Sequence, residues 1–185
     1  YLAAFAAYLA ADLVFVARTT QPNYIVFEND IVNNSYVGMI GGGQTINMYN
    51  WSYRYIICHE IGHALGLKHE HQRPDRNTYV QINTANITSG ASGNFSISNS
   101  ATTYGAYDFD SIMHYGDYSF SSNGQPTITC IAPYQSYQNV VGNRDHLSLL
   151  DAQGMATRYG AAPVPVISNI SPPSATSGSG VTLTI

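Results

Sequence analysis

The sequence predicts an α+β fold in which strands come early and two helices follow. Three observations carry this prediction. Two β-rich runs lie within residues 23–50, a helical spacing of apolar residues covers residues 53–70, and a second helical pattern covers residues 147–160. Between the helices the chain is rich in Asn, Ser and Thr without a period, which favours loops. The 185 residues suffice for one main domain and a piece of another.

The opening run, YLAAFAAYLAADLVFVA, predicts a buried helix that leads into a strand. Leu2, Phe5 and Leu9 share one helix face, and LVFVA at residues 13–17 is β-rich. The run is shorter than the roughly 20 residues of a membrane span, contains Asp12 and follows no basic segment. It matches neither a membrane helix nor a clear signal peptide.

The elements of the central region follow from turn and capping residues. NYIVFEN and GQTINMYN predict two strands, divided by a Gly- and Asn-rich turn segment. The helix over residues 53–70 is expected to end near Gly66, because glycine adopts a left-handed C-cap most easily. Residues 77–105 are expected to be mostly loop with short turns. The last helix has Ser148 as N-cap, Asp151 three residues later and Gly160 at its end.

The composition changes at AAPVPV, which reads as an extended linker. A strand, a Pro/Ser/Gly turn and a further strand follow, and the sequence stops there. We therefore expect a main domain over residues 1–160 and the beginning of another over residues 161–185.

The surface is predicted to be polar but weakly charged. Charged residues make up 10% of the chain, against roughly 25% in an average soluble domain, and the net charge is −4. The few Lys and Arg residues are scattered, which argues against nucleic acid as a partner. The two cysteines, Cys58 and Cys130, allow either one bridge or two buried thiols.

The segment HEIGHALGLKHEHQRPDR, residues 59–76, has the spacing of a zinc site. His59 and His63 lie four apart on one helix face, so both imidazoles can bind one metal ion. His69 would point away on a continuous helix, so the chain must reverse, and Gly66 permits this. Three imidazoles leave a coordination position for water, as a catalytic zinc site requires. Glu60 lies beside the metal, where a general base for that water is needed.

This segment resembles the zinc-binding signature of the astacins, a branch of the metzincin zinc endopeptidases. DSIMHYGDYSFS, residues 110–121, is similar to the family's Met-turn, VGMIGGGQTINM to its cleft-edge strand, and VGNRDHLSLLDAQGM to its last helix region. The resemblance covers roughly residues 1–160. It implies a two-lobed metzincin-type zincin: an N-terminal mixed sheet with long helices, an active-site helix ending in a Gly turn, and an irregular C-terminal lobe with the Met-turn and a terminal helix.

The resemblance also implies roles for single residues. His59, His63 and His69 would bind one catalytic Zn²⁺, and Glu60 would be the general base. Tyr115 would be a further ligand that swings away to stabilise the oxyanion. Met113 would form the apolar floor under the metal.

Further implied roles lie outside the metal site. Glu70 would receive the mature N-terminal amine, and Arg144 would bind an acidic side chain just after the scissile bond. Gly43 and Gln44 would lie on the rim strand that holds an extended substrate, although an interior sheet strand is the alternative. Arg73, Asp75 and Arg76 are expected to form a structural charge network.

The sequence also departs from the family pattern. The family's disulfide positions read Asp12, Asn33 and Trp51 here, so its bridges are absent. The first strand and the mature N-terminus of the family are missing before Tyr1. These departures and the tail after residue 160 favour a secreted protein of bacterial type, whose tail resembles the start of an immunoglobulin-like domain of the IPT/TIG type.

Two function classes remain. The first is a secreted, monomeric zinc endopeptidase that acts on proteins or peptides and has no membrane span. The second is a catalytically inert zinc-binding adhesion or scaffold module. Glu60 distinguishes them, because a module that only holds a metal has no use for a general base.

Overall fold

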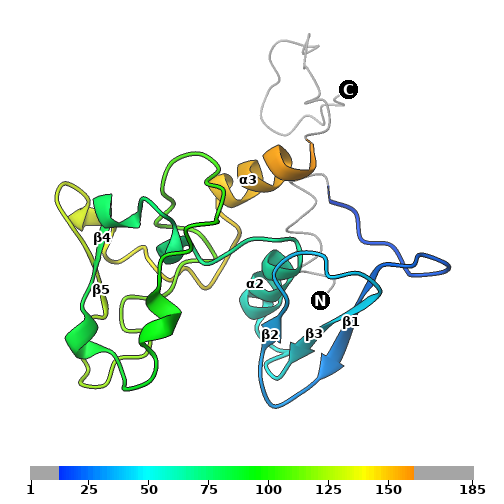
Figure 1. Cartoon of the computed structure of the whole chain (residues 1–185), viewed down its shortest axis with the longest axis horizontal. Helices are drawn as coiled ribbons and strands as arrows, with labels where there is room; N and C mark the ends of the chain where they lie inside the picture. Colours follow the sequence, from blue (N-terminus) through cyan, green and yellow to red (C-terminus); the bar gives the residue numbers. More distant parts are fainter. Residues whose placement is uncertain (1–12, 161–185) are drawn as a thin grey trace, which may run out of the picture.

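The computed structural model describes residues 13–160, which form two regions on either side of the predicted zinc segment (Figure 1). A sheet packed on helix α2 makes one region, and the short strands β4 and β5 with long loops make the other. Helix α3 lies across the top of the view. The helix predicted at the start of the chain and the second domain predicted over residues 161–185 fall outside the described residues.

The first region contains a mixed sheet with the strand order β1-β3-β2. Strand β1 (Tyr24–Asn29) pairs in parallel with β3 (Gly43–Met48), and β2 (Asn34–Ser35) pairs antiparallel with β3. Ile46 and Met48 point to the same face of β3 and are fully buried. They pack with apolar side chains of α2, so the sheet and the helix share one core. The mixed sheet predicted from the sequence is confirmed.

Helix α2 (Arg54–Ala64) ends near Gly66, as predicted, with Leu65 as its C-cap. Gly66 has φ +93°, the left-handed conformation that glycine adopts without steric cost. The Gly66 N–H donates to the His63 carbonyl at 2.7 Å, and the Leu67 N–H donates to the Gly62 carbonyl at 2.9 Å. These two bonds form a Schellman motif, which satisfies the last helix carbonyls and reverses the chain.

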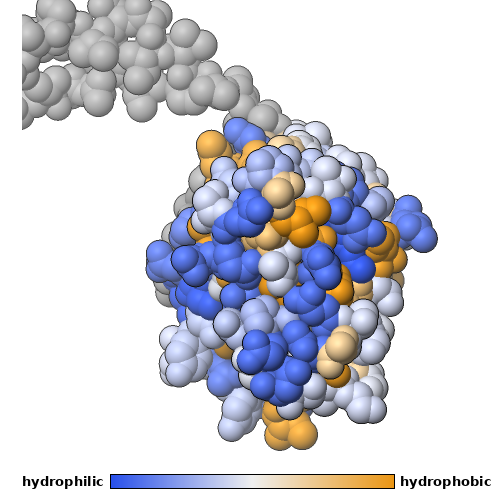
Figure 2. All heavy atoms as spheres, turned by 90° about the vertical axis from the view of Figure 1, so that its left-hand side faces the viewer, coloured by the Kyte–Doolittle hydropathy of each residue, from blue (hydrophilic) through white to orange (hydrophobic). Residues whose placement is uncertain are grey.

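The second region is largely irregular, as the composition predicts, but it contains a two-stranded sheet that the sequence did not reveal. Strand β4 (Val80–Ile82) pairs antiparallel with β5 (Ile128–Cys130). Aromatic rings form much of its core, with Tyr79 stacked on Tyr107 at 4.6 Å between centroids. Figure 2 shows that hydrophilic residues dominate the outer face of this region, with scattered hydrophobic ones.

Helix α3 (Leu149–Tyr159) has the predicted capping box. The Asp151 N–H donates to Ser148 Oγ, and the Asp151 carboxylate accepts from the Ser148 N–H. Gly160 follows with φ +88°. The boundaries predicted for this helix are confirmed.

The strand predicted over residues 13–17 is wrong. Leu13 and Phe15 are partly buried against the core while Val14 and Val16 are exposed, which explains the alternating pattern. Within residues 13–160, however, no strand pairs with this segment.

No helix among the described residues has the length and apolar character needed to cross a membrane.

Candidate active site

Three imidazoles converge between the two regions. His59 and His63 come from one face of α2, and His69 follows the Gly66 turn. The Nε2 atom of His69 lies 3.2 Å from Nε2 of His59 and 3.2 Å from Nε2 of His63. Two nitrogens bound to one tetrahedral zinc at about 2.0–2.1 Å are about 3.3 Å apart, so the spacing fits that ion.

The outer ring nitrogens of His59 and His63 show that these two side chains are oriented to bind a cation. Nδ1 of His59 lies 2.9 Å from the Ile112 carbonyl, and Nδ1 of His63 lies 2.8 Å from the Leu67 carbonyl. Carbonyls only accept hydrogen bonds, so these Nδ1 atoms carry the protons and both Nε2 lone pairs face the centre. Such lone pairs repel each other at this distance unless a cation lies between them. The residues therefore fit zinc.

Burial keeps the three imidazoles in the neutral form that binds metal. It lowers the pKa of His59 to about 3 and that of His69 to about 2, and it also lowers the pKa of His63. Protons therefore do not compete for the ligand nitrogens at neutral pH. Among the described residues, these three histidines are the group of His, Cys, Asp or Glu side chains close enough to share an ion.

Glu60 lies on α2 between the two helical histidines and is 6% exposed. Its Oε2 atom is buried and has no hydrogen-bond partner in the described part of the chain. Burial raises the pKa of this carboxyl group to about 7. A buried oxygen without a partner needs an explanation, and a reacting molecule beside the ion would supply one.

The turn that follows residue 110 brings Met113 and Tyr115 to the same place. Met113 is 1% exposed, and its carbonyl accepts the Glu70 N–H at 3.2 Å. The Tyr115 ring lies 4.6 Å from the His69 ring and stacks on His71 at 4.1 Å, both measured between centroids. Burial raises the pKa of Tyr115, and the negative charge of Glu60 raises it further. Thus the Tyr115 ring lies beside two imidazoles, and the backbone of Met113 is tied to the residue that follows His69.

The sequence left two alternatives for the strand that carries Gly43 and Gln44, an edge strand or an interior strand of the sheet, and each describes one part of β3. Strand β3 is interior where Ile46 and Asn47 pair with β2. At Gly43 and Gln44 it pairs with β1 on one side, and β2 does not extend to these residues. The Gln44 side chain is 4% exposed and is engaged by the preceding loop, since Oε1 accepts the Ile40 N–H. On the side away from β1, the backbone of Gly43 and Gln44 thus has no strand partner among the described residues.

Comparison with known proteins decides the family. A family model described as "Astacin", a peptidase family, matches residues 3–160. The chain belongs to the astacin family. Its fold is the astacin fold, since high choriolytic enzyme 1 of Oryzias latipes, a hatching enzyme zinc-protease, is similar with a TM-score of 0.79 and 33% identity. That match covers 87% of this chain and 81% of the hatching enzyme chain.

Curated relatives are similar over parts of their length. Zinc metalloproteinase nas-12 of Caenorhabditis elegans is 45% identical over 109 residues, which are 57% of this chain and 28% of the relative. Flavastacin of Elizabethkingia meningoseptica is 34% identical over 147 residues, 79% of this chain and 32% of the relative. The astacin chain thus spans less than a third of the length of either relative.

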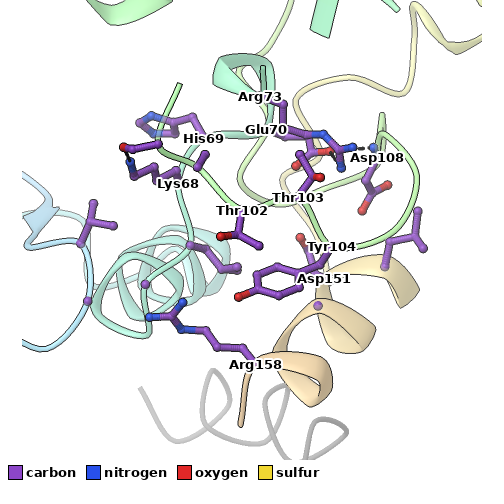
Figure 3. A pocket seen from close by; sticks show the side chains of 18 of the residues that line it. Lys68, His69, Glu70, Arg73, Thr102, Thr103, Tyr104, Asp108, Asp151 and Arg158 are labelled. Carbon is purple, nitrogen blue, oxygen red and sulfur yellow. Dashed lines mark hydrogen bonds and ion pairs between the residues drawn. The ribbon is translucent and has the colours of Figure 1, made fainter. Parts of the chain in front are cut away.

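Behind the imidazoles, a pocket of about 280 Å³ lies between α2 and α3. Figure 3 shows Glu70, Arg73 and Asp108 on one side of it and Tyr104 and Arg158 on the other. Glu70 Oε1 accepts the Asp108 N–H at 2.9 Å and an Arg73 N–H at 3.1 Å. Burial raises the pKa of Glu70 to about 7. An amine could therefore meet a buried carboxyl group in this pocket.

Arg73 and Asp75 form the expected charge network, whereas Arg76 donates instead to the backbone carbonyls of His71 and Phe95. The Arg73 guanidinium pairs with Glu70 at 3.1 Å and with Asp75 at 2.8 Å, and it also donates to two backbone carbonyls. Arg73 is 7% exposed, so its charge is compensated inside the protein.

Arg144 is exposed on the loop before α3. Burial lowers the pKa of both His59 and His114, and the charge of Arg144 lowers both further. Within residues 13–160 no carboxylate lies at ion-pair distance from Arg144. The chain therefore presents a cation beside the site that is not neutralised by a carboxylate.

Two cysteines and one aspartate complete the surroundings. Cys58 and Cys130 are both buried and are not joined by a disulfide, so of the two alternatives the structure has two buried thiols. The sequence did not reveal the second task of Asp151, which accepts from Ser111 Oγ at 2.7 Å and from the Ile112 N–H at 2.9 Å. A capping aspartate gives no sequence signal for such a distant partner.

Proposed function

We propose that residues 1–160 are the catalytic domain of a secreted zinc endopeptidase that hydrolyses internal peptide bonds of proteins. One observation carries the proposal: Nε2 of His69 lies 3.2 Å from Nε2 of both His59 and His63, and Glu60, which follows His59 in α2, has a buried Oε2 without a hydrogen-bond partner in the described part of the chain. The family and the zinc metalloproteinases among the relatives support this reading. We propose a single Zn²⁺ as cofactor, held by His59, His63 and His69.

Zinc, when bound, supplies Lewis-acid polarisation of the peptide carbonyl and lowers the pKa of water. In our proposal, Glu60 takes a proton from the attacking water on Oε2 and later delivers it to the nitrogen of the leaving amine. The low-polarity environment suits this task, because burial brings the pKa of the carboxyl group near neutrality. The carboxyl group is then able to hold the proton and to release it.

Tyr115 is proposed as a further ligand in the resting enzyme, whose hydroxyl then donates to the developing oxyanion. The ring position supports this, since it lies against His69. Met113 is proposed as the apolar floor of the site. Gly66 is the structural residue that lets the chain reverse, and its left-handed φ of +93° supports that role.

The substrate is proposed to lie extended along β3. Backbone groups of Gly43 and Gln44 would pair with it by β-augmentation, because β2 leaves this part of the strand open. Arg144 would bind an acidic side chain just after the scissile bond. An Arg fork suits a carboxylate, and this one lacks a carboxylate partner among the described residues.

Glu70 is proposed to receive the N-terminal amine of the mature protein. Its place on the wall of the pocket behind the metal site supports this. The amine would compensate a carboxyl group that burial otherwise disfavours in its charged form.

We also propose a monomeric protein of bacterial type, in which residues 161–185 are a linker and the start of an IPT/TIG-like domain. The relative from the bacterium Elizabethkingia meningoseptica supports the type. Secretion accords with the hatching enzyme among the similar structures. A protein or peptide is the proposed partner.

Metal removal and restoration tests the proposed function. The chain loaded with one equivalent of Zn²⁺ should cleave a quenched peptide internally, lose this activity in a chelator and regain it with zinc. Mass spectrometry of the fragments identifies the cleaved bond. If the folded chain binds zinc but cleaves neither peptides nor unfolded proteins, the inert adhesion or scaffold module is the correct reading.

A further inference from the structure

Tyr55 lies on the same face of α2 as the metal site. It precedes His59 by four residues, so the two side chains are neighbours one helical turn apart. Tyr55 is partly buried and packs against the core cluster shared by the sheet and the helix. Its ring is therefore held in place at the edge of the site, although the zinc signature that begins at His59 does not include it.

The face of this ring meets the guanidinium of Arg144. The Arg144 Cζ atom lies 5.5 Å from the Tyr55 ring centroid, within the range of a cation–π interaction. The other contact of the guanidinium is a hydrogen bond from Nη1 to the neighbouring Asn143 carbonyl at 2.9 Å. Among the hydrogen bonds, ion pairs and ring contacts of the described residues, the ring of Tyr55 thus links this exposed arginine side chain to another structural element.

The backbone that carries Arg144 is fixed independently of Tyr55. The Asn143 side chain, on a residue that is 9% exposed, donates to the Asp110 carbonyl at 2.9 Å and accepts the Asp145 N–H at 2.8 Å. Arg54 donates to the Asp145 carbonyl at 2.8 Å, which ties the loop to the first turn of α2. The position of the loop backbone therefore does not depend on Tyr55. The direction of the Arg144 side chain, by contrast, depends on the Tyr55 ring.

We propose that Tyr55 is a specificity-determining positioning residue, whose ring face holds the Arg144 guanidinium where it meets an acidic substrate side chain. This inference rests on the proposed role of Arg144. An arginine that is already oriented loses less side-chain freedom when it binds a carboxylate, so the ring raises affinity for acidic substrates only. The expected factor is about two- to fivefold, which corresponds to the roughly 0.5–1 kcal/mol of an exposed cation–π contact.

The test uses two quenched peptides that differ only in Asp or Asn just after the scissile bond. The ratio of their kcat/KM values is measured for the zinc-loaded full chain and for Tyr55→Leu, Tyr55→Phe, Arg144→Met and the double variant Tyr55→Leu/Arg144→Met. Binding is compared without turnover in the Glu60→Gln chain, with and without the additional Tyr55→Leu substitution. For both proteins, the Kd values of the unlabelled Asp and Asn peptides are measured and their ratio is taken.

We expect Tyr55→Leu to lower the Asp/Asn ratio about two- to fivefold, mainly through KM of the Asp peptide, while the Asn peptide is unaffected. Tyr55→Phe should keep the ratio, because the ring face remains. In the double variant, Tyr55→Leu should add nothing to the effect of Arg144→Met.

Three results would overturn the inference. Equal losses for both peptides in Tyr55→Leu would indicate a structural role only. An unchanged ratio in Tyr55→Leu, together with a ratio that collapses in Arg144→Met, would refute the positioning role and leave the proposed acidic preference intact. An unchanged ratio in Arg144→Met would refute that preference itself, and the role of Tyr55 with it.

Discussion

Replacing Asp151 by alanine should destabilise the domain and loosen the metal site together. The carboxylate accepts from Ser111 Oγ at 2.7 Å, from the Ile112 N–H at 2.9 Å and from the Ser148 N–H at 3.2 Å. Through these bonds the first turn of α3 holds the turn that precedes Met113. The link continues to the metal site, because the Ile112 carbonyl accepts from His59 Nδ1.

The magnitude follows from the three donors that would lose their acceptor. Asp151 is 7% exposed, so water replaces the carboxylate poorly. Each buried donor left without a partner costs about 1–3 kcal/mol, so the free energy of unfolding should fall by about 3 kcal/mol or more. Against a total of about 5–15 kcal/mol, this is a large loss. The affinity for zinc should also fall about 10- to 100-fold, as it does when an outer partner of a metal-binding histidine is disturbed.

Urea unfolding followed by circular dichroism measures the first effect, and competition with a zinc chelator measures the second. Burial raises the pKa of Asp151 to about 6, so the measurements belong at pH 8, where the carboxylate is charged. Ser148→Ala is the matched control: it removes the helix cap and should cost about 1 kcal/mol without a change in zinc affinity. A loss below about 1 kcal/mol in Asp151→Ala, or unchanged zinc affinity, would show that the carboxylate does not link α3 to the metal site.

Three further predictions concern the turn, the loop and the thiol near the site. Gly66→Ala should lower the free energy of unfolding by about 1–2 kcal/mol and weaken zinc binding. Gly90 is also left-handed, at φ +84°, but lies in open space, so Gly90→Ala should leave zinc binding unchanged. Urea unfolding and zinc titration compare the two variants. Hydrogen bonding to Asp110 raises the pKa of His146. The contribution of this pair to the free energy of unfolding should therefore be complete below about pH 6.5 and vanish as the pH rises past the folded-state pKa of His146. Because both groups are half exposed, His146→Gln should lose at most about 1 kcal/mol at pH 5 and nothing at pH 8; an effect that grows with pH would contradict this. The Cys58 thiol, whose pKa burial raises to about 11, should react with a thiol reagent only as fast as the domain unfolds, and fast labelling of the native protein would refute its burial.

The parts of the fold predicted from the sequence are those governed by local rules. The Gly66 turn and the capping box at Ser148 depend on residues within one helical turn, and both are confirmed. The histidine spacing likewise placed three imidazoles at one point because two of them share a helix face.

The parts that the sequence did not reveal depend on distant partners. Strands β4 and β5 have three residues each, too few for a clear alternating pattern, and their pairing joins segments 46 or more residues apart. The contact of Asp151 with Ile112 and that of Tyr55 with Arg144 likewise join residues that are far apart in the sequence. The strand predicted over residues 13–17 failed for the opposite reason, since partial burial gave a strand pattern without a ladder partner among the described residues.

Parallel assay of the zinc-loaded chain and its Glu60→Gln variant decides whether this domain is a zinc endopeptidase with Glu60 as its base. The substrate is a quenched peptide with Asp just after the scissile bond, and zinc content and folding are measured for both proteins. Wild-type cleavage should fall at least about 100-fold in the variant, since a positioned general base contributes typically 10²–10⁴-fold. Zinc content should remain the same, because Glu60 is not among the converging groups. Equal cleavage by both proteins would exclude Glu60 as the base, and no cleavage by either, while both are folded and hold zinc, would exclude the endopeptidase.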